Sequence, residues 1–312
     1  MSPTDASGRP SGSTLVAFAL SVTIGGANFL AVRFSNRELD PLWGAGLRFS
    51  LAAALFVVIV WAMRLRWPRG RQLGLTIAYG FLSIALFYAL MYWALVQVTA
   101  GVATVVLAVV PLLTVLLAAA QRLERLRRRA VVGSLLALLG IAWMTLGPQD
   151  LEVPLPALLA MLAAALCIGE GVILGKRLSG AHPAMTNAVA LPVGAVALLG
   201  LSAVAGEDWV VPTQPEVVWS VVYLVTLGSV GLFVLVLLVV RDWTASATSY
   251  MFVLFPVVTM LLSAWLADEP VSAQGVVGAG LVMAGVWFGA LSPAARRDPT
   301  PVLAEAPTTS GT

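Results

Sequence analysis

Charged residues are scarce in this 312-residue sequence, and their scarcity excludes an ordinary soluble domain. Only 11% of the residues are Asp, Glu, Lys or Arg, whereas 60% are hydrophobic. A soluble domain carries roughly a quarter charged residues, which cover its water-facing surface. The hydrophobic residues also gather in blocks of about 20, the length of helix that spans a hydrocarbon core of about 30 Å. The composition therefore predicts a polytopic membrane protein.

The sequence also has a single cysteine, Cys167, and a single histidine, His182. One cysteine excludes an internal disulfide, and these two residues are too few for a Cys/His metal cluster. Neither a phosphate-binding loop nor a nucleophile-triad motif is found, so we expect no ATP-driven pump and no cofactor. The net charge of +3 comes from basic residues between hydrophobic blocks, which favours a role in membrane orientation over nucleic-acid binding.

Ten hydrophobic blocks are predicted to be membrane-spanning helices, because lipid offers no partners to unpaired backbone groups. The polar ends, 1–14 and 293–312, are predicted to be disordered tails. Five helices fall within residues 15–148 and five within 149–292. The blocks cover residues 15–34, 41–63, 73–96, 100–120, 130–146, 155–175, 184–205, 217–240, 245–267 and 271–291.

The distribution of charge predicts that both termini are cytoplasmic. Only Arg33 and Arg37 then fall in an outer loop, and the outer loops carry acidic residues such as Glu38, Glu207 and Asp208. This asymmetry follows the positive-inside rule, and it supports both the helix count and a location in the cell membrane. The basic residues of the inner segments are Arg9, Arg64, Arg66, Arg69, Arg71, Arg122, Arg125, Arg127, Arg128, Arg129, Lys176, Arg177, Arg241, Arg296 and Arg297.

A shift of 145 residues brings two segments of the chain into register without a gap. The segment "TAGVATVVLAVVPLLTVLLAAAQRLE" from Thr99 matches "TASATSYMFVLFPVVTMLLSAWLADE" from Thr244, with Pro111 on Pro256. Because five helices per half is an odd number, the second half would enter the membrane from the opposite side. An inverted repeat of this kind has two similar energy minima, one open to each side. The pattern therefore predicts a transporter that works by alternating access.

The chain resembles the drug/metabolite transporter superfamily, in particular its EamA-like members. The motifs that carry the resemblance are "GGANFLAVRF", "DPLWGAGLRFSLAAALF", the proline-centred fourth helix followed by "RLERL", its counterpart ending in "LADEP", and the glycine-rich "VVGSLLALLGIAWMTLG" and "VVGAGLVMAGVWFGAL". They extend over nearly all of residues 15–291. The resemblance implies a ten-helix secondary carrier with cytoplasmic termini that exports a small metabolite, such as an amino acid, a nucleoside or a drug-like molecule.

Glu170 is a carboxylate inside a hydrophobic helix, in the stretch "ALCIGEGVIL". A charge near the bilayer centre costs about 2.5–3.5 kcal/mol on insertion scales, and such residues usually serve a polar pathway. At 1.5 Å per residue, Glu170 lies about 22 Å and Arg48 about 10 Å below the outer ends of their helices, too different in depth for a direct ion pair. Glu170 suits proton coupling or a cationic substrate; the alternative is a carboxylate that reaches the inner headgroup layer.

Other polar or aromatic side chains at membrane depth are candidate substrate contacts. Arg48 suits an anion or carboxylate contact, or alternatively a structural role near the outer interface. Tyr88 and Tyr92 are four residues apart and share one helix face, which suits a cavity for an organic solute. The alternative for each is ordinary packing with a satisfied hydroxyl. The remaining candidates are Asn28, Trp93, Thr248 and Tyr250.

Three prolines are predicted to kink their helices. Pro111, Pro192 and Pro256 each remove a backbone hydrogen bond, and lipid tolerates this where neighbours or a water-lined cavity satisfy the freed carbonyl. A passive packing kink is the alternative. Glu124 and Glu269 precede the fifth and tenth helices, so we expect their carboxylates to stabilise the positive N-terminal ends of those helices.

Together these patterns predict an all-α integral membrane carrier that binds a small molecule near mid-membrane, between the halves. Helices one to four and six to nine would line the site. Energy would come from an ion or solute gradient. Export is the leading mechanism, and exchange for protons is one way to drive it. Two alternatives stay open, a passive channel and a membrane-embedded enzyme with Glu170 as its acid. No metal is expected, and the sequence leaves the substrate and the oligomeric state open.

Overall fold

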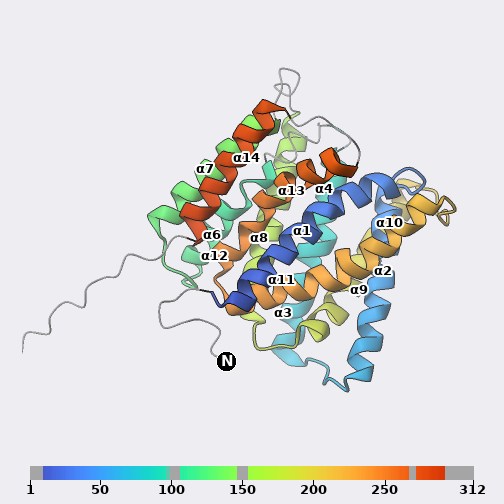
Figure 1. Ribbon diagram of the computed structural model, residues 1–312. Helices are drawn as coiled ribbons and strands as arrows, with labels where there is room; N and C mark the ends of the chain where they lie inside the picture. The colour runs from blue at the N-terminus through green and yellow to red at the C-terminus, as the bar shows by residue number, and fades with distance from the viewer. Residues whose placement is uncertain (1–9, 96, 98–105, 146–153, 267–271, 292–312) are drawn as a thin grey trace, which may run out of the picture.

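The computed structural model describes residues 10–95, 97, 106–145, 154–266 and 272–291 (Figure 1). Every regular element within these ranges is a helix. In the described residues, eight helices are long and apolar enough to cross a membrane, and α6 (Val110–Ala120) is apolar but shorter. The all-helical membrane class is thus confirmed. The predicted fourth span, 100–120, lies partly outside the described residues.

The helices of the two halves follow one another in the same order. The first half contains α1 (Gly12–Ser35), α2 (Pro41–Ala62), α3 (Gly70–Gly80), the π-helical turn η1 (Phe81–Leu86), α4 (Phe87–Leu95), α6 and α7 (Arg128–Thr145). The second half contains α8 (Leu155–Arg177), α9 (Pro183–Ala205), α10 (Pro215–Val225), the π-helical turn η3 (Thr226–Gly231), α11 (Leu232–Asp242), α12 (Ala245–Ser249), α13 (Met251–Leu266), α14 (Ala273–Val286) and the π-helical turn η4 (Trp287–Leu291).

Local sequence signals set many of the helix boundaries. Pro41, Pro183 and Pro215 are each the first residue of a helix, where the missing N–H has no intrahelical acceptor to lose. The Ser272 hydroxyl accepts a hydrogen bond from the backbone N–H of Gly275 at 3.0 Å and caps α14. Gly206 ends α9 in the left-handed conformation, with φ of 74°.

The 145-residue register extends beyond the segments in which it was found. In the first half, α3, η1, α4 and α7 begin at residues 70, 81, 87 and 128, and α10, η3, α11 and α14 begin 145 residues later at 215, 226, 232 and 273. The third and the eighth span therefore each carry a π-helical turn at the same position. Such turns are rare inside helices and frequently mark functional sites.

Most of the large helix contacts join one half of the chain to the other. Helix α2 packs along α9, and α7 packs along α14, which Figure 1 shows side by side. Helix α1 contacts α13 and α11, while α8 contacts α6 and α4. Exchanging the two halves leaves the α2–α9 and α7–α14 contacts as they are. It converts the α1–α13 contact into α8–α6 and the α1–α11 contact into α8–α4. The arrangement of contacts thus has the same internal symmetry as the sequence.

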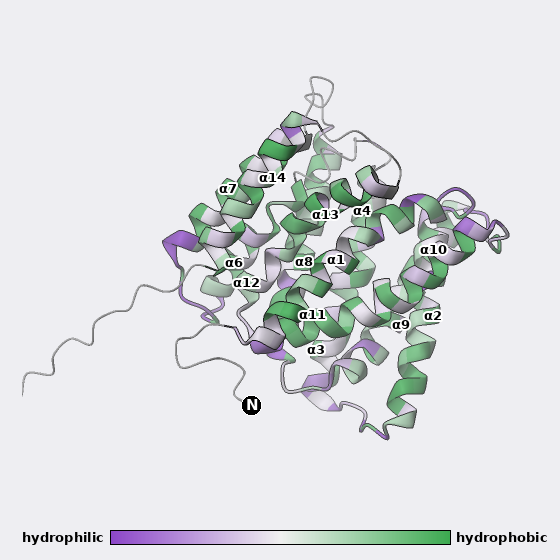
Figure 2. Ribbon diagram, viewed as in Figure 1, coloured by the Kyte–Doolittle hydropathy of each residue, from purple (hydrophilic) through white to green (hydrophobic). Residues whose placement is uncertain are grey.

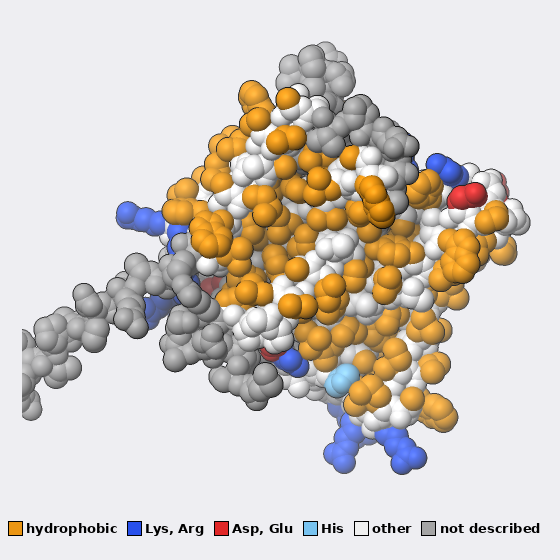
Figure 3. Space-filling view, viewed as in Figure 1, with side chains coloured by type: hydrophobic (Ala, Val, Ile, Leu, Met, Phe, Trp, Pro, Cys, Tyr) orange, Lys and Arg blue, Asp and Glu red, His pale blue; other side chains and the backbone are white. Residues whose placement is uncertain are grey.

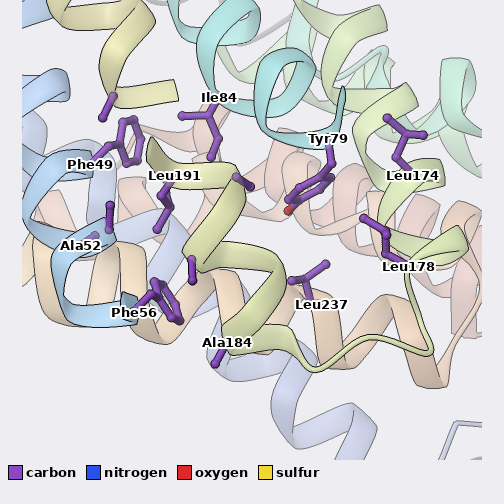
Figure 4. Packing of buried hydrophobic residues seen from close by; sticks show 14 of the residues in the cluster. Phe49, Ala52, Phe56, Tyr79, Ile84, Leu174, Leu178, Ala184, Leu191 and Leu237 are labelled. Carbon is purple, nitrogen blue, oxygen red and sulfur yellow. The ribbon is translucent and has the colours of Figure 1, made fainter. Parts of the chain in front are cut away.

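Buried apolar side chains fill the contact between α2 and α9. Phe49 and Phe56 of α2 and Leu191 of α9 are fully buried and lie close together (Figure 4). On the outside, large apolar residues such as Trp61 and Val204 are exposed. Hydrophobic side chains cover most of the face in Figure 3, and the charged residues lie at its margins. The hydropathy colouring in Figure 2 has the same pattern, as expected of a surface that faces lipid.

Acidic residues form hydrogen bonds between two loops, residues 36–40 and 206–214, at one end of the molecule. The Glu38 carboxylate accepts hydrogen bonds from the Thr213 hydroxyl at 2.7 Å and from the backbone N–H groups of Thr213 and Gln214. The Thr213 hydroxyl and these N–H groups lower the pKa of Glu38. The Glu207 carboxylate accepts the backbone N–H groups of Leu42 at 3.0 Å and Trp43 at 2.7 Å, at the N-terminus of α2.

Basic residues gather at the opposite end, where α8 finishes and α9 begins. The Lys176 ammonium donates to the backbone carbonyl of Arg241 at 2.8 Å and to that of Trp243 at 2.6 Å. Glu124 accepts the backbone N–H groups of Ala245 and Ser246, so it caps α12. The prediction that Glu124 stabilises the helix after it was therefore wrong about which helix, because the fold brings α12 closer to this carboxylate. Glu269 lies outside the described residues.

Close contact between α7 and α14 depends on glycines, and this generates a prediction for Gly140. A Cβ atom at Gly140 would lie 2.8 Å from the Gly278 carbonyl oxygen, whereas a Cβ atom at Gly280 would meet nothing within 4 Å. We expect Gly140→Ala to lower the free energy of unfolding by about 1–3 kcal/mol. Gly280→Ala should leave it unchanged or raise it by up to about 1 kcal/mol.

Titration with sodium dodecyl sulfate in mixed micelles measures both variants against the parent protein. The two substitutions add the same methyl group to the same helix pair, so Gly280→Ala controls for helix propensity. Equal effects of the two substitutions would contradict the close packing of α7 on α14.

Candidate functional site

A cavity of about 230 Å³ lies where helices of the two halves meet. Its walls come from α1, α2, α3, η1, α4 and Leu107 in the first half, and from α8, α11 and α13 in the second. These segments belong to the predicted spans one to four, six, eight and nine. The seventh span, α9, contributes no residue to this wall. Ligand cavities of membrane bundles are commonly built from facing helices in this way.

Arg48 places a positive charge in the cavity wall. The side chain is only 4% exposed. Its Nε donates to the Ser229 hydroxyl at 2.9 Å, and its Nη2 donates to the Gly228 carbonyl at 3.3 Å. The guanidinium carbon also lies 4.7 Å from the centre of the Phe49 ring, within range of a cation–π contact. The π-helical turn η3 therefore supplies neutral partners that hold the cation in position.

Asn28 approaches the same turn from α1. Its Nδ2 donates to the Gly228 carbonyl at 3.1 Å, which leaves its buried Oδ1 without a hydrogen-bond partner among the described residues. A Cβ atom at Gly228 would collide with Asn28 Oδ1, so glycine permits this approach. The third span repeats the arrangement, since Ser83 of η1 lies against Gly171 of α8, where a Cβ atom would collide with Ser83 Oγ.

Ser83 Oγ is the second unpartnered polar atom of the cavity wall. It is buried and has no hydrogen-bond partner within the described part of the chain. Buried polar groups nearly always find a partner in proteins or water. Both residues line the same cavity, so a polar ligand bound there would have two candidate partners close by, Ser83 Oγ and Asn28 Oδ1.

Comparison with known proteins identifies the fold and the family. The sequence profile of the EamA-like transporter family matches residues 12–146 and again residues 155–290. The chain belongs to the EamA-like transporter family. This membership makes the chain a multi-pass membrane transporter and excludes the enzyme alternative, because the family consists of transporters.

Several relatives align with this EamA-like transporter over most of their length. An uncharacterized transporter of Archaeoglobus fulgidus is 27% identical over 88% of this chain and 97% of its own. A probable terminal-alkyne amino-acid exporter of Streptantibioticus cattleyicolor is 27% identical, with 87% and 91% covered. A probable amino-acid metabolite efflux pump of Salmonella typhimurium is 28% identical, with 86% and 92% covered. A crystal structure of a protein 20% identical in sequence has the same fold, with a TM-score of 0.75 over 89% of this chain and 96% of that one.

Four of the predicted site residues line the cavity of this EamA-like transporter. Asn28, Arg48, Tyr88 and Pro256 all belong to its wall. The Tyr88 ring packs edge-on against Phe49, with ring centres 5.0 Å apart. Pro256 lies inside α13, directly after Phe255, which also faces the cavity.

Other predicted site residues lie away from the cavity wall. Glu170 is half-buried and accepts a hydrogen bond from Gln121 Nε2 at 2.6 Å, and Gln121 Oε1 in turn accepts one from Arg177. The Tyr250 hydroxyl donates to the Ala130 carbonyl at 2.7 Å. The Thr248 hydroxyl donates to the carbonyl of its own helix four residues earlier, at 2.8 Å. These three side chains have local partners.

The remaining predicted residues are two prolines and two aromatic residues of α4. Pro111 stands in the first turn of α6, and Pro192 lies inside α9, a helix that contributes no residue to the cavity wall. Trp93 is half-exposed on α4. Tyr92 belongs to α4, and its side chain lies outside the described residues.

Ser83, Gly228 and Ser229 were not among the predicted site residues. Hydroxyl residues are common in membrane helices because their side chains can bond to the preceding turn, so Ser83 and Ser229 had no distinguishing feature. In the 145-residue register Ser83 aligns with Gly228. This alignment was the one sequence feature that could have related the two positions. Within the described residues, no group of three or more His, Cys, Asp or Glu side chains is arranged to hold a metal ion.

The unpartnered hydroxyl of Ser83 generates a prediction about stability. We expect Ser83→Ala to leave the free energy of unfolding unchanged or to raise it, because the substitution removes a buried polar atom that has no partner among the described residues. Ser134 is the control, since it is also buried, with 1% of its surface exposed against 6% for Ser83, but its hydroxyl donates to the Ala130 carbonyl at 2.8 Å. Ser134→Ala should lower the free energy of unfolding by about 1 kcal/mol. Unfolding in mixed micelles measures both, and a loss for Ser83→Ala as large as for Ser134→Ala would contradict the assignment.

Proposed function

We propose that this EamA-like transporter is a secondary carrier that exports a small organic molecule across the cell membrane by alternating access. In this proposal the chain crosses the membrane ten times, as two inverted five-helix repeats, residues 15–148 and 149–292. Both termini, 1–14 and 293–312, then lie in the cytoplasm. The observation that carries the proposal is a cavity lined by helices of both halves, which include the equivalent helices α1 and α8 and the equivalent helices α4 and α11.

The contacts between the halves support alternating access. Helices α1 and α8 occupy equivalent places in the two halves, and each packs on helices of the opposite half. A molecule built in this way can exchange the roles of its halves, so a conformation open to one side has a counterpart open to the other. The third and eighth spans carry equivalent π-helical turns beside the cavity, and such turns frequently occur at functional sites.

The two polar ends support the proposed orientation. The loop at residues 36–40 is tied to the loop at 206–214 by acidic side chains, while Lys176 and Arg177 lie at the other end of the helices. Basic residues favour the cytoplasmic side. The names of the relatives, which include an amino-acid exporter and an efflux pump, support outward transport of a metabolite.

Counterflow in reconstituted vesicles tests the carrier directly. Vesicles are preloaded with an unlabelled solute identified by thermal-shift screening, since a ligand of the folded state raises its stability. A carrier should then drive transient uphill uptake of the labelled solute. Vesicles that contain a Gly171→Leu variant, in which the new side chain would enter the cavity wall, should give no uptake. Simple equilibration of label in the parent protein would indicate a passive channel.

Proton exchange through Glu170 is the proposed source of energy. The Gln121–Glu170 hydrogen bond joins α6 of the first half to α8 of the second. Opening of the cavity toward the cytoplasm would separate these helices and leave the carboxylate free to take up a proton. We therefore expect Glu170→Gln to remove the dependence of transport on a pH gradient while counterflow, which needs no net proton movement, is retained.

The measurement is solute flux with and without an imposed pH gradient, in matched vesicles. Glu216→Gln is the control, because Glu216 is an exposed carboxylate in the first turn of α10. Solute flux through the Glu216→Gln variant should respond to the pH gradient as flux through the parent protein does. An unchanged response in Glu170→Gln would end the coupling proposal.

A further inference from the structure

We propose that the cavity selects an organic anion, with a carboxylate of the substrate bound to Arg48. The inference deepens the proposed function, since it names the charge of the molecule that the carrier would bind. It rests on the charge of the cavity wall, on the free donors of Arg48, on the two unpartnered polar atoms and on the asymmetry between the halves.

The cavity wall is positively charged. Arg48 is the one charged side chain among the described residues that line it, and no described carboxylate stands beside it. A buried cation without a counter-ion is costly, because the low-dielectric surroundings replace only part of its hydration. A bound anion would restore neutrality, whereas an amine would place a second positive charge in the same space.

The geometry of Arg48 leaves donors for a ligand. Its described hydrogen bonds use Nε and Nη2, to Ser229 and Gly228, and both partners are neutral. A guanidinium has five N–H groups in a planar fork, so Nη1 and the second N–H of Nη2 stay available. The Phe49 ring covers one face of the guanidinium and fixes its plane. A fork held in this way suits a planar carboxylate, which can accept two parallel hydrogen bonds.

The other side chains of the cavity wall indicate the chemistry of the rest of the ligand. Phenylalanine side chains from both halves, among them Phe29, Phe87 and Phe255, provide an apolar surface for an organic body. Asn28 Oδ1 and Ser83 Oγ are buried there without partners among the described residues, and each can accept an N–H or O–H group. The complementary ligand is therefore a small carboxylate with an apolar body and a neutral polar donor.

The charge belongs to one half of the chain only. Helix α9 is the counterpart of α2, and the two helices begin 142 residues apart, at Pro41 and Pro183. A shift of 142 to 145 residues from Arg48 reaches 190–193, which are Ala, Leu, Pro and Val. Symmetry of the repeat therefore does not require an arginine here. A bound anion would account for a charge that the repeat itself does not supply.

Binding of matched ligand triads to the purified full-length protein tests the inference. The three members of a triad share one carbon skeleton and carry a carboxylate, a neutral amide or an amine. The first triad is phenylacetate, phenylacetamide and phenethylamine. The second is mandelate, mandelamide and 2-amino-1-phenylethanol, and the third is isovalerate, isovaleramide and isoamylamine. Affinities are measured by tryptophan fluorescence in detergent. We expect the carboxylate of at least one triad to bind about tenfold or more tightly than its amide and amine.

Two arginine variants separate a binding role from loss of folding. Arg48→Gln should reduce carboxylate affinity at least to that of the amide, and Arg48→Lys, which keeps the charge but not the fork, should retain part of the preference. Arg37→Gln removes the same charge from an exposed position beside Phe34, outside the cavity, and should bind as the parent protein does. Melting temperature and gel filtration establish that each variant is folded.

The outcomes keep this inference separate from the proposed function. Amine binding equal to or tighter than carboxylate binding, no carboxylate bound in any triad, or unchanged carboxylate affinity in a folded Arg48→Gln variant would each overturn the anion site. Counterflow of an amine would retain the carrier and reject the anion site. Tight carboxylate binding without counterflow would retain the site and reject the carrier.

Discussion

Contact between helices of opposite halves is the constraint on which the rest of this structure depends. Lipid tails give apolar helices no reason to associate, so membrane helices are held by close packing and by polar contacts. Here α7 meets α14 through glycines, and α2 meets α9 through fully buried Phe49, Phe56 and Leu191. Each of these pairs joins one helix of the first half to one helix of the second half. The packing between the halves therefore fixes the positions of the helices around the cavity. The cavity is a consequence of how the repeat packs.

Polar groups inside the bundle are arranged around two equivalent π-helical turns. In η3 the Gly228 carbonyl accepts hydrogen bonds from both Asn28 and Arg48, and in η1 Ser83 lies against Gly171. Such turns leave backbone carbonyls and small residues exposed to neighbouring helices. They allow a buried cation to be held without a carboxylate partner. The same region therefore combines a fixed charge, two polar atoms without partners among the described residues, and both π-helical turns.

The class of the protein, its repeat and its family follow from the sequence, whereas the positions of side chains around each helix do not. Hydropathy and the 145-residue register depend on composition and order, which the sequence contains directly. Most spans are apolar on every face, so periodicity cannot indicate which face turns inward. Glu170 illustrates the limit, because the next residue, Gly171, lines the cavity, and one residue along a helix is a rotation of about 100°. Asn28 and Arg48 could be selected because a buried polar side chain is unusual there, but Ser83 could not.

Opposite orientation of the two halves is the central claim, and the labelling of equivalent loops tests it most directly. In a Cys167→Ser background, single cysteines replace Asn36, between α1 and α2, and Gly180, between α8 and α9, both of which are exposed. A membrane-impermeant maleimide is applied to intact cells and to inverted membrane vesicles. The account predicts that the cysteine at position 36 reacts only from outside and the cysteine at position 180 only from the cytoplasmic side. Reaction of both from the same side would contradict it.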